Sequence, residues 1–393
     1  MEGEQQGVEA KEEVFEGMKS FAVEDTEGQR AFFDTYGFVV VRDVLDSTEV
    51  DATVDEIWTD TEALANRAKF DGTKASGQLV SPLEGDTLLS RDDPNTWKTW
   101  PSMGMGILGG DIAAGPQAWT NRQHPRVHQV YANLFGTEKL ISSVDRYGIM
   151  RPTKNVKMMK KRKSVDAEGN EVEVVEEVVK DRPNWQTTEQ WFHWDLAVWA
   201  WFGLAPCPDP QKEQDIHDGW LMSGAMKFIT ENNGTVDFKG YEKMQGLLAL
   251  SDSTEEDGGF ETVPGYHKFL ETWAKQTPIF NKGSFVYVPK EDPLREHSQK
   301  ITARKGSLVV WSSRMPHCNY PNTGPNFRFV QYLKMFPAVV MPPTNSSIWS
   351  VRAQVLRHRL PQGFEPSELG QLVFGLQPWE GLEAKDNKKC LLM

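Results

Sequence analysis

The sequence predicts a mainly β fold with flanking helices, built around a double-stranded β-helix core of the jelly-roll, cupin-like type. Two observations predict it. Short apolar or alternating segments recur and are separated by turn residues, and their number is close to what a jelly roll needs. They lie near residues 191–202, 225–229, 244–251, 258–263, 284–289, 307–312 and 327–336. Helical patterns lie mostly before and after this series, which predicts helices that flank the core.

Three divisions of the chain follow. Residues 1–25 are acidic and lack an apolar centre, so they predict a solvated tail and no signal peptide. Residues 26–343 form the predicted catalytic domain, with helices from Thr26, over Ser47–Lys69 and over about Pro125–Phe135, and a strand from Tyr36. Residues 344–393 predict a C-terminal helical extension.

Residues 158–181 predict a charged β-hairpin inserted in this domain, because Asp166–Asn170 is turn chemistry between two alternating stretches. The basic run 160–163 is typical of a nuclear signal or a phosphate-binding patch. It also faces a glutamate-rich strand across the hairpin, and we favour cross-strand pairing of these charges as the simpler interpretation.

Composition excludes several classes of protein. The chain has 393 residues and a formal net charge of −13, which argues against a general affinity for nucleic acid, since such binding needs Lys and Arg. No uncharged apolar run is long enough for a transmembrane helix. Three cysteines without a C-x-x-C pair are typical of a reducing compartment, so we expect a cytoplasmic protein. The oligomeric state is left open.

The last four residues, Cys390 to Met393, have the form of a prenylation box. A chance tail on a soluble enzyme is the favoured alternative. If Cys390 is prenylated, one lipid chain and two lysines give only reversible membrane association.

The segment Trp191–Asp195 carries the strongest chemical signal. On an extended strand His193 and Asp195 point to the same side, and together they are two thirds of the two-His, one-carboxylate triad that holds non-haem Fe(II). This tripeptide alone is explained equally well by a His and an Asp that form a hydrogen bond in the core and bind no metal.

A second signal lies downstream. A turn and a buried strand at 305–313 lead to His317, and after a loop an alternating strand carries Arg328. Guanidinium binds a carboxylate through two parallel hydrogen bonds, so this arginine suits an acidic cosubstrate. His193, Asp195, His317 and Arg328 therefore form one set.

This set resembles the phytanoyl-CoA dioxygenase-like family of Fe(II)/2-oxoglutarate oxygenases, and the likeness covers roughly residues 27–340. Residues 36–45 are similar to the family's opening strand, and residues 244–252 and 258–267 to its central strand, acidic turn and P-G-x-H segment. The resemblance implies that His193, Asp195 and His317 bind iron and that Arg328 binds the distal carboxylate of 2-oxoglutarate. It also implies secondary cosubstrate contacts from Gln245 and Asn319.

The activity implied by this resemblance is hydroxylation of a C–H bond in a small-molecule substrate, with Fe(II), 2-oxoglutarate and O₂ as cofactors and succinate and CO₂ as coproducts. An aspartate at position 195 favours a hydroxylase over a halogenase. The sequence departs from the family in the long interval of 317 − 195 = 122 residues, which we attribute to loops at 206–219 and 276–298. Two alternatives stay open: a catalytically inactive family member, and another cupin-like metal-binding protein.

Overall fold

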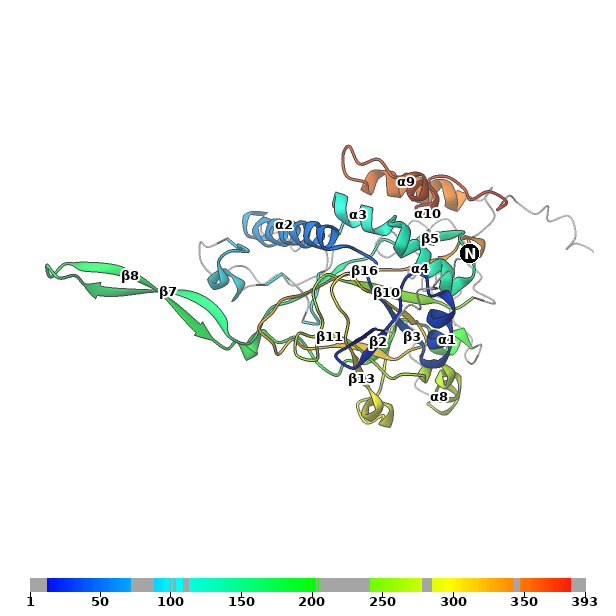
Figure 1. Ribbon diagram of the computed structural model, residues 1–393, viewed down its shortest axis with the longest axis horizontal. Helices are drawn as coiled ribbons and strands as arrows, with labels where there is room; N and C mark the ends of the chain where they lie inside the picture. Colours follow the sequence, from blue (N-terminus) through cyan, green and yellow to red (C-terminus); the bar gives the residue numbers. More distant parts are fainter. Residues whose placement is uncertain are drawn as a thin grey trace, which may run out of the picture.

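The computed structural model describes residues 13–71, 88–98, 100–101, 104–108, 113–202, 204, 241–277, 285–341 and 347–382. Two antiparallel sheets form the centre of the molecule (Figure 1). The first has the order β3 (Phe38–Val41), β14 (Leu308–Ser312), β10 (Met244–Ala249), β16 (Arg328–Leu333), β6 (Tyr147–Met150) and β4 (Ile107–Leu108). The second has the order β12 (Val286–Tyr287), β9 (His193–Trp194), β15 (His317–Tyr320), β11 (Gly259–Thr262) and β13 (Gln299–Ile301).

The inner faces of the two sheets pack on each other, as in a jelly roll. Their shared core includes Leu247 and Trp311 from the first sheet, and Phe260 and Ile301 from the second. No strand ladder joins the two sheets within the described residues, so the barrel is open rather than closed. The prediction of a mainly β fold with a jelly-roll core and flanking helices is confirmed.

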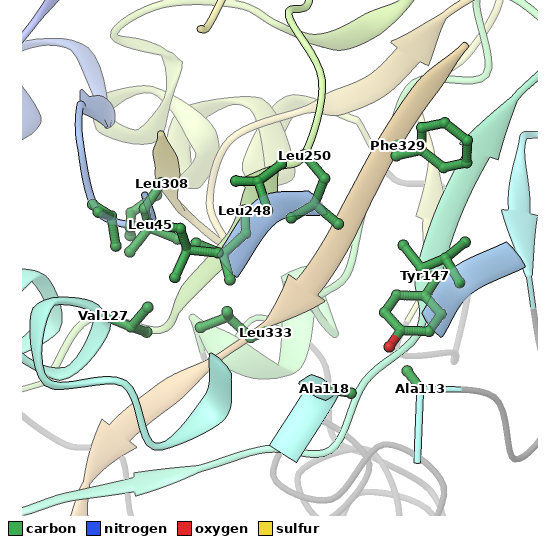
Figure 2. Close-up of a cluster of buried hydrophobic side chains, with 14 of the residues drawn as sticks. Leu45, Ala113, Ala118, Val127, Tyr147, Leu248, Leu250, Leu308, Phe329 and Leu333 are labelled. Carbon is green, nitrogen blue, oxygen red and sulfur yellow. The ribbon is translucent and has the colours of Figure 1, made fainter. Parts of the chain in front are cut away.

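The outer face of the first sheet is covered by helices. These are α2 (Ser47–Asp71), α3 (Pro116–Arg122) and α4 (Pro125–Phe135). Figure 2 shows Leu248 and Leu333 of the sheet beside Val127 of α4 and Ala118 of α3, all within one buried cluster. Because the helices cover the outer face, the side chains on the other face of each strand point into the space between the two sheets.

Strand β16 illustrates that choice of face. Phe329 and Leu333 belong to the outer cluster, whereas Val330 and Tyr332 contact the inner core. Side chains alternate along a strand, so Arg328 lies on the same inner face as Val330 and Tyr332. Strand β6 pairs with it, Gly148 opposite Val330 and Met150 opposite Arg328.

The N-terminal region differs from the prediction. Strands β1 (Glu13–Phe15) and β2 (Met18–Ser20) form a small hairpin, and Met18, Phe21 and Val23 are buried. Residues 13–25 are therefore not a solvated tail, because these scattered apolar side chains find a surface on the sheet. Helix α1 (Thr26–Tyr36) follows and ends at Gly37, whose φ of 79° is a left-handed conformation that glycine adopts without strain.

The predicted hairpin is formed by β7 (Val156–Val165) and β8 (Glu171–Lys180), which pair in register from end to end. Figure 1 shows this hairpin extending away from the rest of the molecule. Its basic strand faces its acidic strand, with Lys161 2.8 Å from Glu173 and Lys163 3.2 Å from Glu171. The structure therefore agrees with cross-strand pairing of the charges.

The C-terminal helices α9 (Ser347–Arg359) and α10 (Glu368–Val373) lie where the sequence predicts helices. They pack on α3 and on a two-stranded sheet of β5 (Leu140–Ser142) and β17 (Met335–Pro337). Among the helices of the described residues, none is both long and apolar enough to cross a membrane. Cys390 lies outside the described residues.

Other predicted elements are corrected or lie outside the described residues. The expected strand at 191–202 is wrong beyond β9, because the chain turns into the short helix α5 (Val198–Trp201). An apolar run without alternation fits a buried helix as well as a strand. The sequence analysis missed β5, β6, β13 and β15. The expected strand at 225–229 and loop at 206–219 lie outside the described residues. The described part of 276–298 contains β12, within the strand expected at 284–289, and the 3-10 turn η4 (Pro293–His297).

The remaining helical elements are short. They are α8 (Leu270–Gln276) and the 3-10 turns η1 (Pro94–Lys98), η2 (Pro183–Trp185), η3 (Tyr266–Lys268), η4 (Pro293–His297) and η5 (Ala338–Val340).

Candidate active site

Three side chains from the second sheet meet at one point. His193 of β9 lies opposite His317 of β15 in the antiparallel register, and Asp195 follows directly after β9. His193 Nε2 is 3.6 Å from Asp195 Oδ1, and His317 Nε2 is 4.0 Å from Asp195 Oδ2. One donor atom from each residue lies within 4.8 Å of the others. The structure thus brings together the three residues that the sequence analysis selected from positions up to 124 residues apart.

Both imidazoles are oriented by the same backbone contact. His193 Nδ1 is 3.3 Å from the carbonyl oxygen of Trp191, and His317 Nδ1 is 3.0 Å from that of Met315. A carbonyl can only accept, so each Nδ1 carries the hydrogen and each Nε2 is left with a free lone pair directed at Asp195. A hydrogen bond from the ring nitrogen that does not bind the metal commonly fixes the orientation of a metal-binding histidine.

The charge states of the cluster also suit a metal. Burial, together with the neighbouring His317, lowers the pKa of His193 to about 3, and burial lowers the pKa of His317. Burial raises the pKa of Asp195, but electrostatic interactions with His193 and with the cations Lys334 and Arg146 outweigh this effect and hold that pKa below its ordinary value. Neutral imidazoles and an ionised carboxylate are the forms that bind a divalent cation.

A cavity of about 200 Å³ opens beside this cluster. Aromatic side chains form part of its lining: the His193 ring stacks between Trp191, at a centroid distance of 4.8 Å, and Phe285, at 4.2 Å. Phe260 and Trp311 line the inner side. Such walls exclude water from the reacting centre and strengthen electrostatic interactions there.

The other predicted residues lie on the inner faces of neighbouring strands. Gln245 of β10 and Asn319 of β15 line the cavity, and Asn319 Nδ2 donates to the Tyr332 hydroxyl at 3.1 Å. Arg328 does not line the cavity. It is buried on the inner face of β16, four residues before the cavity-lining Tyr332. Five of the six predicted residues therefore line one cavity, and Arg328 is buried outside its lining on the inner face of β16.

Arg328 and Gln245 have unpaired buried groups. Within the described residues, Nε and Nη1 of Arg328 and Nε2 of Gln245 have no hydrogen-bond partner. Leaving buried donors unpaired is costly, most of all for a charged group. A bound anion that accepts from this guanidinium would remove that cost, so the arrangement fits an acidic cosubstrate, and the two imidazoles and one carboxylate fit a non-haem iron.

Sequence reasoning missed a second charged group at the cavity, formed by Asp145, Arg146 and Lys334. Asp145 Oδ1 is 3.4 Å from Arg146 Nε, and Asp145 Oδ2 is 3.3 Å from Lys334 Nζ. No motif marks these residues, because their proximity depends on the pairing of β16 with β6.

Parts of this sequence match known proteins. The phytanoyl-CoA dioxygenase (PhyH) family model matches residues 229–330, a range that contains His317 and Arg328 but begins after His193 and Asp195. A putative phytanoyl-CoA dioxygenase of Dictyostelium discoideum is 27% identical over 344 residues, covering 86% of this chain and 81% of its own length. The chain is therefore similar to the phytanoyl-CoA dioxygenase family. With its His–Asp–His cluster, it is a non-haem iron oxygenase of the 2-oxoglutarate-dependent type, with Fe(II), 2-oxoglutarate and O₂ as cofactors.

Solved structures show weaker likeness to this chain. GlcNAc Inducible Gene 2 of Candida albicans is 12% identical, with a TM-score of 0.48 over 93% of this chain and 79% of its own. The epimerase SnoN, solved with Fe³⁺, α-ketoglutarate and nogalamycin RO, is 15% identical, with a TM-score of 0.42 over 82% of this chain and 88% of its own. Scores this low carry no argument about function.

Proposed function

We propose that this protein hydroxylates a C–H bond of a small organic molecule, consuming 2-oxoglutarate and O₂ and releasing succinate and CO₂. The observation that carries the proposal is the convergence of His193, Asp195 and His317 beside an aromatic cavity, with both Nδ1 atoms held by carbonyls.

In this proposal the two Nε2 atoms and the Asp195 carboxylate hold iron from one side. The cavity leaves the opposite side open for cosubstrate and substrate. Asp195 also decides the outcome, because a small residue at this position would leave a coordination position for halide. Its presence supports hydroxylation.

Arg328 is proposed to bind the distal carboxylate of 2-oxoglutarate, using the donors that lack partners within the described residues. Gln245 and Asn319 are proposed as secondary contacts, since both line the cavity. When bound, iron and 2-oxoglutarate supply the oxidation itself: 2-oxoglutarate loses CO₂, and the substrate C–H bond becomes C–OH. The protein orients these groups, and Trp191 and Phe285 shield them from water.

The test is anaerobic binding of Fe(II) and then 2-oxoglutarate, followed by succinate release after O₂ is admitted. Wild-type protein is expected to bind both and to release succinate, faster when a substrate is present. His297→Ala, which replaces an exposed histidine away from the cavity, is the matched control for His317→Ala. Metal binding without any 2-oxoglutarate binding or turnover would contradict the proposal and indicate another cupin-like metal protein.

A further inference from the structure

The cavity carries a surplus of positive charge that the proposed cofactors do not use. Arg146 and Lys334 share one carboxylate, Asp145, so this group of three has one positive charge in excess. Among the described residues that line the cavity, Asp195 is the one further acid, and it is committed to the metal in the proposed function. Arg328, the proposed partner of 2-oxoglutarate, lies at the opposite end of β16 from Lys334.

The backbone places these cations on the interior face. Arg146 precedes Gly148, which faces Val330 across the sheet, and the Arg146 carbonyl accepts from the Tyr332 amide at 2.9 Å. Alternation along β6 therefore directs the Arg146 side chain to the same face as Gly148. Lys334 is fixed from the other side by reciprocal contacts with Ser143: its amide donates to Ser143 Oγ at 3.0 Å and its carbonyl accepts from the Ser143 amide at 2.8 Å.

Arg146 is the more available of the two cations. The Lys334 side chain is 11% exposed and held against Asp145, whereas the Arg146 side chain keeps 43% of its surface exposed. In the described part of the chain its guanidinium makes one hydrogen bond, from Nε to Asp145. The two Nη groups remain available, and a planar pair of donors matches a carboxylate.

We propose that Arg146 binds an acidic group of the substrate, so that the substrate is an organic acid with an apolar body. Asp145 and Lys334 act as positioning residues that hold the guanidinium at the cavity. The apolar body lies against the aromatic and aliphatic walls, which include Met105, Ile107 and Phe285. This inference rests on the proposed function, because it assumes that Arg328 and the His–Asp–His cluster are occupied by cosubstrate and metal.

The test uses full-length protein loaded anaerobically with Fe(II) and saturating 2-oxoglutarate. The probes are butanoate, hexanoate and phenylacetate, each compared with its uncharged amide by titration calorimetry. We expect at least one acid to bind wild-type protein about 10-fold or more tightly than its amide, the scale of one charge-assisted hydrogen-bonded pair. Equal binding of every acid and its amide, or no binding of any acid, overturns the proposal.

Variants separate substrate from cosubstrate as the source of the anion. Arg146→Gln is expected to remove the preference for the acid while 2-oxoglutarate affinity stays within about twofold, and Arg146→Lys to retain part of the preference. Arg91→Gln, at an exposed arginine paired with Asp55, is the matched control and should behave as wild type. If Arg146→Gln weakens 2-oxoglutarate binding instead, Arg146 belongs to the cosubstrate and the proposal fails.

Lys334→Gln gives a second, independent variant, with thermal unfolding as the check that each protein is folded. It is expected to weaken acid binding while the amide is unaffected, because Arg146 then turns towards Asp145. Unchanged acid binding in both Arg146→Gln and Lys334→Gln overturns the proposal. Failure of wild-type protein to bind 2-oxoglutarate at all is distinguishable from these results, and contradicts the proposed function itself.

Discussion

The interior cavity and the β7–β8 hairpin are both rich in charged side chains, but these side chains differ in exposure and in pairing. On the hairpin each strand carries mainly one sign, and pairs such as Lys161–Glu173 lie in solvent, with more than half of each side chain exposed. At the cavity, Asp145 and Lys334 are largely buried, and Arg328, buried on the same sheet, has donors without partners among the described residues. Exposed pairs contribute little free energy, whereas buried unpaired charges are costly. The exposed hairpin charges therefore add little stability, whereas the buried Arg328 guanidinium calls for an anionic partner.

The largest expected effect is at the cluster of His193, Asp195 and His317. His193→Ala or His317→Ala is expected to abolish succinate release and to weaken Fe(II) binding strongly, since two remaining ligands hold a labile divalent ion poorly. The measurement is iron content and succinate formation in metal-stripped buffer with added Fe(II). Wild-type activity in either variant would show that these histidines are not ligands.

Arg328→Met tests whether the buried guanidinium binds 2-oxoglutarate at a cost in stability. We expect the 2-oxoglutarate requirement to rise by about one to two orders of magnitude, because a charge-assisted pair is lost. The unfolding temperature of the cofactor-free protein should stay the same or rise, since an apolar side chain of similar length removes a buried charge. Iron affinity should change little.

The outcome that contradicts this assignment is a loss of iron with an unchanged 2-oxoglutarate requirement. A lower unfolding temperature without cofactors would show that the guanidinium stabilises the fold, and the contrast with the hairpin would then fail.

Shortening the hairpin tests the other side of the comparison. Lys160 and Glu176 are directly opposite, so residues 161–175 can be replaced by Asn-Gly, which closes a two-residue turn. The base, where Met158 contacts the main core, is retained. We expect succinate release within about twofold of wild type and a nearly unchanged unfolding temperature, because exposed ion pairs of this kind contribute little. Loss of turnover would assign the hairpin a catalytic role.

The smallest effect is expected at one ion pair. The hydrogen bond and charge of Glu173 raise the pKa of Lys161, so any contribution to stability is present below the ordinary lysine pKa and is lost as the pH rises through the folded value. Both side chains are exposed, and a double-mutant cycle of Lys161→Gln and Glu173→Gln at neutral pH should give no coupling in thermal unfolding. A clear coupling that disappears at high pH would show that the hairpin charges matter.

Local patterns predicted much of this architecture. The apolar strands β10 and β14, the helix α4 between Pro125 and Gly136, and the hairpin turn at Asp166–Asn170 each depend on residues within one segment. The extent of β9 could not be predicted, because the run from Trp191 is apolar on every side and its periodicity does not distinguish a strand from the buried helix α5.

The residues of the candidate site also include some that the sequence predicted and some that it did not. His193, Asp195 and His317 were selected from the H-x-D tripeptide, the downstream histidine and the family resemblance. Arg146 and Lys334 were missed because an arginine after an aspartate and a lysine after a strand are common, and only long-range pairing brings them to one carboxylate. The same holds for the carbonyl contacts that orient the two histidines, which depend on backbone geometry.

The order of strands in the first sheet has a consequence for biosynthesis. β3 (Phe38–Val41) pairs with β14, about 270 residues later, and β6 pairs with β16, about 180 residues later. Both early strands leave the ribosome long before their partners exist, and non-local pairing of this kind folds slowly. The proposed iron site, which needs β15 beside β9, can form only after β15 has been synthesised, late in the chain. Pulse-labelled hydrogen exchange should therefore find β3 and β14 protected together, late in folding.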